Sequence, residues 1–324
     1  MTTGHAVGVD IGGTKIAAGL VDESGLIGDL QIVATNAAEG ASAVLERAIE
    51  LAKSLVAETA GNGASAVGIA SGGWIDQTTG CAVGATDLLP GWAGIALRAT
   101  FARALRLPAV GLNDVHAMGI AEARLGAGRA ASICLCVAVG TGIGGAITID
   151  GRLFSGRHGF AGSIGHVPFR LGGRLCSCGR RGCIEAAAGG PGIARAFAAC
   201  LQRRPGSVPA GHAMALPDVV AALHSSEEGR RTCASSVIST AGMRLGRVLG
   251  GLANTLDPER IVVGGGAAAA LGEPFIAAVR SGLSEAVLSP ISVEVVKSGL
   301  GPSASVIGAG LVALDARDGA PRWD

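Results

Sequence analysis

The feature that most constrains the fold is a pattern of strand, glycine turn and strand that occurs twice. AVGVDIGG (6–13) and IAAGLVD (16–22) are β-branched runs on either side of a glycine turn, and SICLCVAVGTGIGGAITIDGRLF (132–154) repeats the arrangement. Such paired runs predict hairpins. A chain of 324 residues has room for two domains of ordinary size. We therefore expect two duplicated lobes, each beginning with a glycine-turned hairpin.

Strands and helices alternate along the rest of the chain. Apolar spacing predicts helices over 41–60, 96–108, 115–128, 189–202, 216–224 and 227–256, and strands over 66–71, 109–114 and 260–266. Residues 203–217 are typical of a surface loop. Residues 130–149 carry no charge, but their β-branched residues and glycine-rich break favour two buried strands over a membrane helix. The alternation predicts an α/β fold.

Charge and cysteine content limit the partners and the compartment. Lys and Arg number 26 against 25 Asp and Glu, so the net charge of +1 gives no general attraction for nucleic acid or an anionic membrane. The first residues, MTTGHAVGVDIGG, show no secretory signal, and we expect a cytoplasmic protein. Disulfides are rare in a reducing compartment. Five of the eight cysteines are therefore expected to be small core residues: Cys81, Cys134, Cys136, Cys200 and Cys233.

Three glycine turns end predicted strands and are candidates for phosphate binding. They are DIGGTK (10–15), GTGIGG (140–145) and GGG (264–266). Glycine lets backbone N–H groups approach phosphate oxygens, and Thr14 and Thr141 add hydroxyl donors. None of the turns matches the Walker A pattern or the dinucleotide-binding fingerprint. We expect a nucleotide-binding fold of another kind.

Two acidic residues lie beside these turns or at a strand end. Asp10 precedes the first glycine turn and is placed to hold a hydrated Mg²⁺ ion, although it could simply cap its own turn. Asp114 follows Asn113 at the carboxyl end of a predicted strand, which is where open α/β sheets bind their ligands. Asp114 is the candidate general base, and an ordinary turn residue is the alternative.

Residues 176–185, CSCGRRGCIE, place three thiols within eight positions. This clustering is compatible with a disulfide, a redox pair of Cys176 and Cys183, or a metal site. Clustered thiols in a reducing compartment favour a metal.

These motifs, taken in order, resemble those of the ROK family (repressors, open reading frames and sugar kinases). The resemblance covers nearly the whole chain through DIGGTK, the Asn-Asp strand end, GTGIGG, AGSIGH and CSCGRRGCIE. It implies an actin-like ATPase (ribonuclease H-like) fold of two lobes, with ATP and a sugar meeting in a central cleft. The implied lobes are residues 1–115, completed by a C-terminal helix at about 304–318, and residues 116–303. A homodimer is also implied.

The resemblance further implies a role for individual residues. Asp114 is the catalytic base. ATP with Mg²⁺ is expected at Asp10, Gly12, Gly13, Thr14, Lys15, Gly140, Thr141, Gly142, Gly265 and Gly266. A structural zinc ion is expected at His166, Cys176, Cys178 and Cys183, a closed ligand set without an open position. Sugar contacts are expected from Gly73, Thr86, Asp87, Asn113, Asp114, Ser163, His166 and Glu185.

Departures from the motif affect the expected sugar. Ser163 stands where many members have a sugar-binding Glu, and Asp87 stands where glucokinases typically have Asn. Thr86 and the Gly72-Gly73-Trp74 run are closer to N-acetylmannosamine kinases. We expect ATP-dependent phosphorylation of the 6-hydroxyl of N-acetylmannosamine, with glucose as the alternative.

Non-enzymatic members of the family are less compatible with the sequence. DIGGTK begins at residue 10, which leaves no room ahead of it for the DNA-binding domain of the family's repressors, and the net charge offers no basic face. A non-catalytic sugar sensor would not need Asp10, Asp114 and both phosphate turns. We therefore expect an enzyme.

Overall fold

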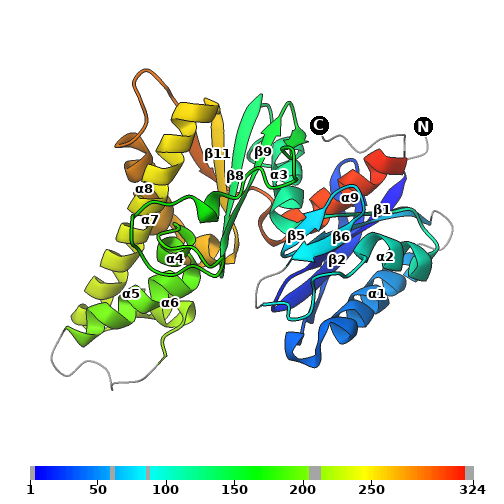
Figure 1. Cartoon of the computed structure of the whole chain (residues 1–324), viewed down its shortest axis with the longest axis horizontal. Coiled ribbons are helices and arrows are strands. Elements are labelled where there is room, and N and C mark those ends of the chain that lie inside the picture. The colour runs from blue at the N-terminus through cyan, green and yellow to red at the C-terminus, as the bar shows by residue number, and fades with distance from the viewer. Residues whose placement is uncertain (1–3, 59–62, 85–87, 204–212, 318–324) are drawn as a thin grey trace. The chain divides into compact units, whose positions relative to one another are not determined.

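The computed structural model describes residues 4–58, 63–84, 88–203 and 213–317, and the chain divides into two compact units (Figure 1). The first unit comprises Met1–Ser132, Ala146–Gly162 and Gly299–Asp324, and the second comprises Ile133–Gly145 and Ser163–Ser298. The expected boundary was residue 115, with the C-terminal helix completing the first lobe; here the first unit contains that helix and also residues 116–132 and 146–162.

The first sheet has the strand order β3-β2-β1-β4-β7. Its first two strands form the antiparallel hairpin that the glycine turn predicts, with Ala6 opposite Val21 and Ile11 opposite Ile16. β1 is parallel to β4, and β4 is parallel to β7. The strands are β1 (His5–Ile11), β2 (Lys15–Asp22), β3 (Gly25–Ala34), β4 (Ala64–Ser71) and β7 (Ala109–Asn113); β5 (Trp74–Asp76) and β6 (Cys81–Gly84) form a separate small hairpin.

Helices cover both faces of this sheet (Figure 1). α1 (Ala41–Glu58) and α2 (Leu97–Leu105) pack on one face in a shared apolar core, and α3 (Asp114–Arg124) and α9 (Ala304–Arg317) lie on the other. Glycines bring α9 directly onto the strands: a Cβ at Gly8 would lie 2.1 Å from the carbonyl oxygen of Val306, and one at Gly68 would lie 1.9 Å from that of Ala309. No larger residue fits at these two positions unless the helix moves.

The second sheet has the order β10-β9-β8-β11-β12, which repeats the order of the first. Three antiparallel strands are followed by two parallel ones in both sheets, as expected of duplicated lobes. The strands are β8 (Ile133–Val139), β9 (Ile143–Ile149), β10 (Arg152–Phe154), β11 (Arg260–Gly264) and β12 (Glu294–Lys297); the helices of the second unit are α4 (Glu185–Ala188), α5 (Gly190–Gln202), α6 (Leu216–Leu223), α7 (Glu228–Leu256) and α8 (Gly266–Ser284). Short 3₁₀ turns are η1 (Ala37–Glu39), η2 (Ile164–His166) and η3 (Gly301–Ser303).

Two element boundaries differ from those expected. Asp114, predicted as the last strand residue, is the first residue of α3, because the Asn113 side chain caps that helix by accepting hydrogen bonds from the N–H groups of Val115 and His116. α2 ends at Leu105 rather than 108, since Arg106 adopts a left-handed conformation with φ 55° ahead of Pro108. Most of the expected loop 203–217 lies outside the described residues.

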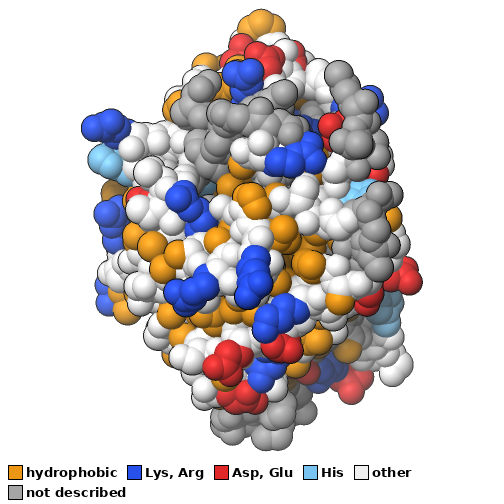
Figure 2. All heavy atoms as spheres, turned by 90° about the vertical axis from the view of Figure 1, so that its right-hand side faces the viewer, with side chains coloured by type: hydrophobic (Ala, Val, Ile, Leu, Met, Phe, Trp, Pro, Cys, Tyr) orange, Lys and Arg blue, Asp and Glu red, His pale blue; other side chains and the backbone are white. Residues whose placement is uncertain are grey.

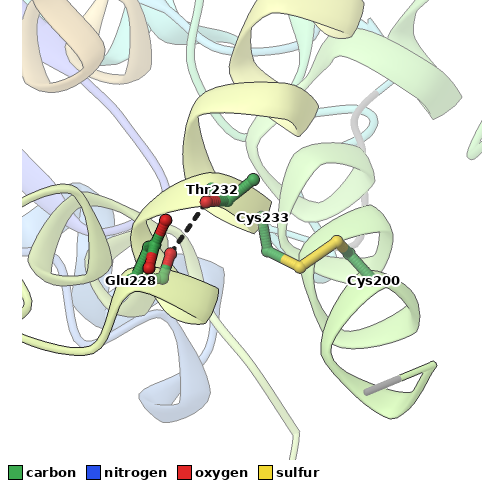
Figure 3. Close-up of a disulfide and its surroundings, with 4 residues drawn as sticks. All are labelled: Cys200, Glu228, Thr232 and Cys233. Carbon is green, nitrogen blue, oxygen red and sulfur yellow. Dashed lines mark hydrogen bonds between the residues drawn. A yellow bond between two sulfur atoms is a disulfide. The ribbon is translucent and has the colours of Figure 1, made fainter.

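The expectation that Cys200 and Cys233 are unpaired core residues is wrong. They form a disulfide that joins α5 to α7 (Figure 3). Their Cα atoms lie 5.8 Å apart, within the range that a disulfide spans without backbone movement. Cys134 and Cys136 are buried, as expected, whereas Cys81 is partly exposed.

The uncharged segment 130–149 forms β8 and all of β9 rather than a helix. Figure 2 shows basic and apolar side chains together in the middle of one face, with acidic side chains mostly toward its edges. Among the described helices, none has both the length and the apolar character needed to cross a membrane.

Candidate active site and metal centre

Asp10 lies near the carboxyl end of β1, paired in register with Ala17 of β2 and Ala70 of β4. Its Oδ1 atom is buried and has no hydrogen-bond partner among the residues that the structure describes. Burial, and then the neighbouring Asp114 carboxyl, raise the pKa of Asp10 to about 7 against an opposing effect of Lys15. A buried carboxylate of this kind needs a cation or a proton.

Asn113 and Asp114 join β7 to α3. The Asn113 Oδ1 atom is occupied by the two backbone donors of the helix cap, and its Nδ2 atom donates to the carbonyl oxygen of Gly73 at 2.8 Å. The Asp114 Oδ1 atom accepts from the N–H of Val115 at 2.9 Å, and burial raises the pKa of this carboxyl. Asp114 is therefore held at the helix start by its own backbone, with the Oδ2 atom beside Gly72.

The Asp10 and Asp114 carboxyls fit a divalent cation. The Asp114 carboxyl raises the cost of ionising Asp10, and a Mg²⁺ ion would offset that cost. A Mg²⁺ ion that keeps most of its waters takes only one or two carboxylates. The unpartnered Asp10 Oδ1 atom is the specific observation behind this assignment. Asp114 remains available to accept a proton, since burial raises its pKa and so makes it a stronger base than an exposed aspartate.

The first glycine turn, residues 10–15, is braced by Thr35, the residue that follows strand β3. The N–H of Gly12 donates to the carbonyl oxygen of Lys15 at 3.0 Å. Thr35, which is fully buried, donates its hydroxyl to the carbonyl oxygen of Gly12 at 2.7 Å and its N–H to that of Thr14 at 3.0 Å. The side chains of Thr14 and Lys15 are exposed, so both are open to a ligand.

The second glycine turn, residues 140–145, is contacted by the carboxylate of Glu185, a residue that the sequence analysis assigned to sugar binding. The Glu185 Oε2 atom accepts from the N–H of Ile143 at 2.9 Å, and a Cβ at Gly142 would lie 2.6 Å from the same oxygen. The Glu185 Oε1 atom accepts from the Ser177 hydroxyl at 2.8 Å and from the Cys176 thiol at 3.3 Å. Glu185 thus links the cysteine motif to the turn.

The cysteine motif forms a compact group of four metal-ligating side chains. Donor atoms of His166, Cys176, Cys178 and Cys183 all lie within 4.8 Å of one another. Two sulfurs on one tetrahedral zinc ion lie about 3.8 Å apart, given a Zn–S bond of about 2.3 Å. The observed Cys178–Cys183 Sγ separation is 3.7 Å, and the Cys176 Sγ atom lies 3.7 Å from His166 Nδ1. The donor set fits a structural zinc ion.

The third glycine turn precedes α8. Gly265 has φ 89° and lies so close to β8 that a Cβ would come within 2.5 Å of the Val139 carbonyl oxygen. Gly265 is the N-cap of α8 and Gly266 its first residue, so this turn presents backbone N–H groups at a helix start. Such an arrangement suits an anionic or polar ligand.

Comparison with known proteins places the chain in a family. The ROK family model matches residues 6–316. The chain belongs to the ROK family. A glucokinase of Halalkalibacterium halodurans is 30% identical over 94% of this chain and 93% of its own, and an N-acetylmannosamine kinase of Escherichia fergusonii is 31% identical over 97% and 98%.

A solved ROK structure supports the expected fold. The ROK glucokinase of Streptomyces griseus in complex with glucose and AMPPNP superposes with a TM-score of 0.83 at 30% identity, covering 96% of this chain and 100% of that one. The expected actin-like ATPase fold is thereby confirmed. The named sugar kinases among these relatives include both glucose and N-acetylmannosamine enzymes at similar identity.

The residues that the sequence predicts for the site fall into two groups, one in each unit. Asp10, Gly12, Gly13, Thr14, Lys15, Gly73, Asn113 and Asp114 belong to the first unit, and Gly140, Thr141, Gly142, Ser163, His166, Cys176, Cys178, Cys183, Glu185, Gly265 and Gly266 belong to the second. Thr86 and Asp87 lie outside the described residues.

One residue at the predicted site, Thr35, and one contact of Glu185 were not expected from the sequence. Thr35 braces the first turn, and Glu185 contacts the second turn in addition to its expected role toward a sugar. A buried threonine at the end of a polar strand gives no recognisable signal, because only the hairpin register brings Thr35 beside Thr14.

Proposed function

We propose that this protein is an ATP-dependent sugar kinase that phosphorylates the 6-hydroxyl of N-acetylmannosamine or a similar N-acylhexosamine. The observation that carries the proposal is the buried Oδ1 atom of Asp10, which has no hydrogen-bond partner among the described residues, in a carboxyl group that is influenced by the charge of Asp114. Phosphoryl transfer needs a cation-binding acid and a base for the incoming hydroxyl. Membership of a family that includes named sugar kinases supports the same conclusion.

Asp114 is proposed to remove the proton of the sugar hydroxyl as it attacks the γ-phosphoryl group. Its raised pKa makes it a stronger base than an exposed aspartate, and the Val115 N–H fixes its orientation. Asp10 is proposed to hold Mg²⁺ through water. When bound, Mg²⁺ neutralises charge on the transferring phosphoryl group.

The glycine turns are proposed to bind the nucleotide. Residues 12–15 and 140–142 would donate backbone N–H groups to the phosphates, and Thr14 and Thr141 would add their hydroxyls. Gly265 and Gly266 are proposed to lie near the adenosine, where the start of α8 presents its backbone.

The Cys₃His group is proposed to hold a structural zinc ion, which fixes the loop that carries Glu185. Glu185 is proposed to bind sugar hydroxyls together with Asn113 and His166. Asn113 has one Nδ2 hydrogen left for this purpose once Gly73 is satisfied. The Glu185 hydrogen bonds to Ile143 and Ser177 would hold its carboxylate in place when the sugar arrives.

Glucose is the second candidate substrate. Curated glucokinases match the chain about as well as N-acetylmannosamine kinases do. Ser163 favours the N-acylhexosamine, because a serine cannot replace the charged acceptor that many relatives present to a hexose. A cytoplasmic location and a homodimer remain predictions from the sequence.

An ATP-consumption assay with glucose, mannose, N-acetylglucosamine and N-acetylmannosamine tests the proposal. We expect turnover with one or more of these sugars, and Asp114→Asn should lower kcat at least about 100-fold, the smaller end of the range for general-base catalysis. Asp29→Asn, at an exposed position on β3, is the matched control and should keep full activity. A protein that binds sugar but consumes no ATP would instead be a sensor.

A further inference from the structure

We propose that an aromatic pair, Trp74 and Phe160, selects acceptors that carry an apolar substituent, namely the N-acyl group of a hexosamine. The inference rests on the proposed function and adds the residues that determine its specificity. Trp74 begins β5, and Phe160 lies in the segment 155–162 that follows β10. Both belong to the first unit.

The two rings contact each other without being fully buried. Their centroids are 6.4 Å apart with an interplanar angle of 61°, an edge-to-face arrangement. Trp74 is partly buried and Phe160 is 46% exposed. The pair therefore leaves apolar surface exposed, and Trp74 directly follows Gly73, a residue that is expected to contact the sugar.

Trp74 is joined to the acceptor residues on one side through Gly73. Gly73 has φ 95°, and its carbonyl oxygen accepts the hydrogen bond from the Asn113 side chain at 2.8 Å. Asn113 immediately precedes the proposed base, Asp114. Trp74 therefore directly follows, in the sequence, the Gly73 carbonyl group that the Asn113 amide holds in place.

Trp74 also packs against Gly84, at the end of β6. A Cβ at Gly84 would lie 2.5 Å from the indole ring, so the end of β6 approaches the ring this closely only because residue 84 is glycine. In the sequence, Gly84 is the last described residue before Thr86 and Asp87, the expected sugar contacts.

Phe160 is held in position by a buried histidine. The His116 Nε2 atom lies 3.1 Å from the carbonyl oxygen of Ala161, and its Nδ1 atom lies 3.4 Å from the Gln77 side-chain amide. The amide can only donate to Nδ1, so Nε2 carries the proton and donates to Ala161. His116 belongs to α3, two residues after Asp114, so the same helix positions the base and the backbone next to Phe160.

An aromatic surface at this point distinguishes acceptors by their ring substituents. N-acetylmannosamine and mannose differ only in having an acetamido group or a hydroxyl at carbon 2. One methyl group in an apolar pocket changes discrimination about 10- to 200-fold. Loss of either ring should therefore remove most of the preference for the acetamido sugar.

The test measures kcat/KM for N-acetylmannosamine and for mannose in the full chain and in Trp74→Leu and Phe160→Ala. Phe154→Ala is the matched control, since Phe154 is a similarly exposed phenylalanine at 43% in the same part of the first unit. We expect the ratio of the two values to fall at least tenfold in Trp74→Leu and Phe160→Ala and to stay unchanged in Phe154→Ala. Thermal unfolding confirms that each variant is folded.

The outcomes separate this inference from the proposed function. An equal effect on both acceptors, or no effect, overturns the role of the aromatic pair and leaves the kinase activity standing. A wild-type preference for mannose or glucose over N-acetylmannosamine does the same. A wild-type protein that phosphorylates no sugar overturns both.

Discussion

Replacing Asp10 by asparagine should stabilise the protein in the absence of nucleotide while it removes activity. Asparagine has nearly the same shape but no charge, so it relieves the burial of an ionised carboxylate and its repulsion by Asp114. The Asp10 pKa rises from 3.8 to about 7 on folding. At 1.36 kcal/mol per pKa unit, a fully ionised Asp10 costs the folded state up to about 4 kcal/mol.

The sign of the pH dependence follows from the same shift. Below about pH 4, Asp10 is protonated in the folded and unfolded states, and the variant gains nothing. Between pH 4 and 7 the unfolded state loses its proton first, so the wild-type protein loses stability as the pH rises. The advantage of Asp10→Asn should grow through this window and level off above pH 7.

Urea unfolding at pH 5 and pH 8 without Mg²⁺ measures the difference. We expect Asp10→Asn to exceed the wild type by more at pH 8 than at pH 5, and addition of MgCl₂ with ATP to stabilise only the wild type. A variant that is less stable than the wild type at pH 8, or an advantage independent of pH, would refute the account of Asp10 as a buried, cation-dependent carboxylate.

Three further changes test other parts of the structure. Cys178→Ser should lower the zinc content of the purified protein, measured by elemental mass spectrometry. Cys81→Ser is the control, because Cys81 lies outside the cluster, and it should leave the zinc content unchanged. Full zinc content in Cys178→Ser would exclude Cys178 as a ligand. The double change of Cys200 and Cys233 to alanine should lower the free energy of unfolding by about 4 kcal/mol in the chain-entropy relation, since the bond closes a loop with a sequence separation of 33; equal stability would show that the bond does not form. Gly68→Ala should destabilise the fold by about 1 to 3 kcal/mol, because the new methyl group meets the backbone of α9, and an unchanged Tm would contradict that contact.

Much of the fold could be predicted because its signals are local. A β-branched run, two glycines and a second β-branched run specify a hairpin wherever they occur, and both hairpins appear. The Asn113-Asp114 pair is also a local signal, and it correctly predicted that β7 ends here. The prediction was wrong by one residue, because it assigned Asp114 to the strand. Asp114 belongs to α3 because the Asn113 side chain caps that helix. The same residues could also have continued the strand, so the sequence alone did not decide between strand and helix.

Features that depend on how distant segments meet were not predictable. Nothing in the sequence near Cys200 or Cys233 distinguishes them from the buried Cys134 and Cys136, and only the packing of α5 on α7 brings their sulfurs together. The contact of Glu185 with the second glycine turn has the same origin, since 42 residues separate it from Ile143.

Because the two sheets have the same strand order, turns at equivalent positions in the two sheets can be compared, and they have different proposed roles. β4 and β11 occupy the same position in their sheets, and the glycines after them, Gly73 and Gly265, are assigned to opposite substrates. Asp10 is the sixth residue of β1, whereas the sixth residue of the equally long β8 is Ala138. The two sheets thus share a strand order but differ at this position, and only the first places a carboxylate there.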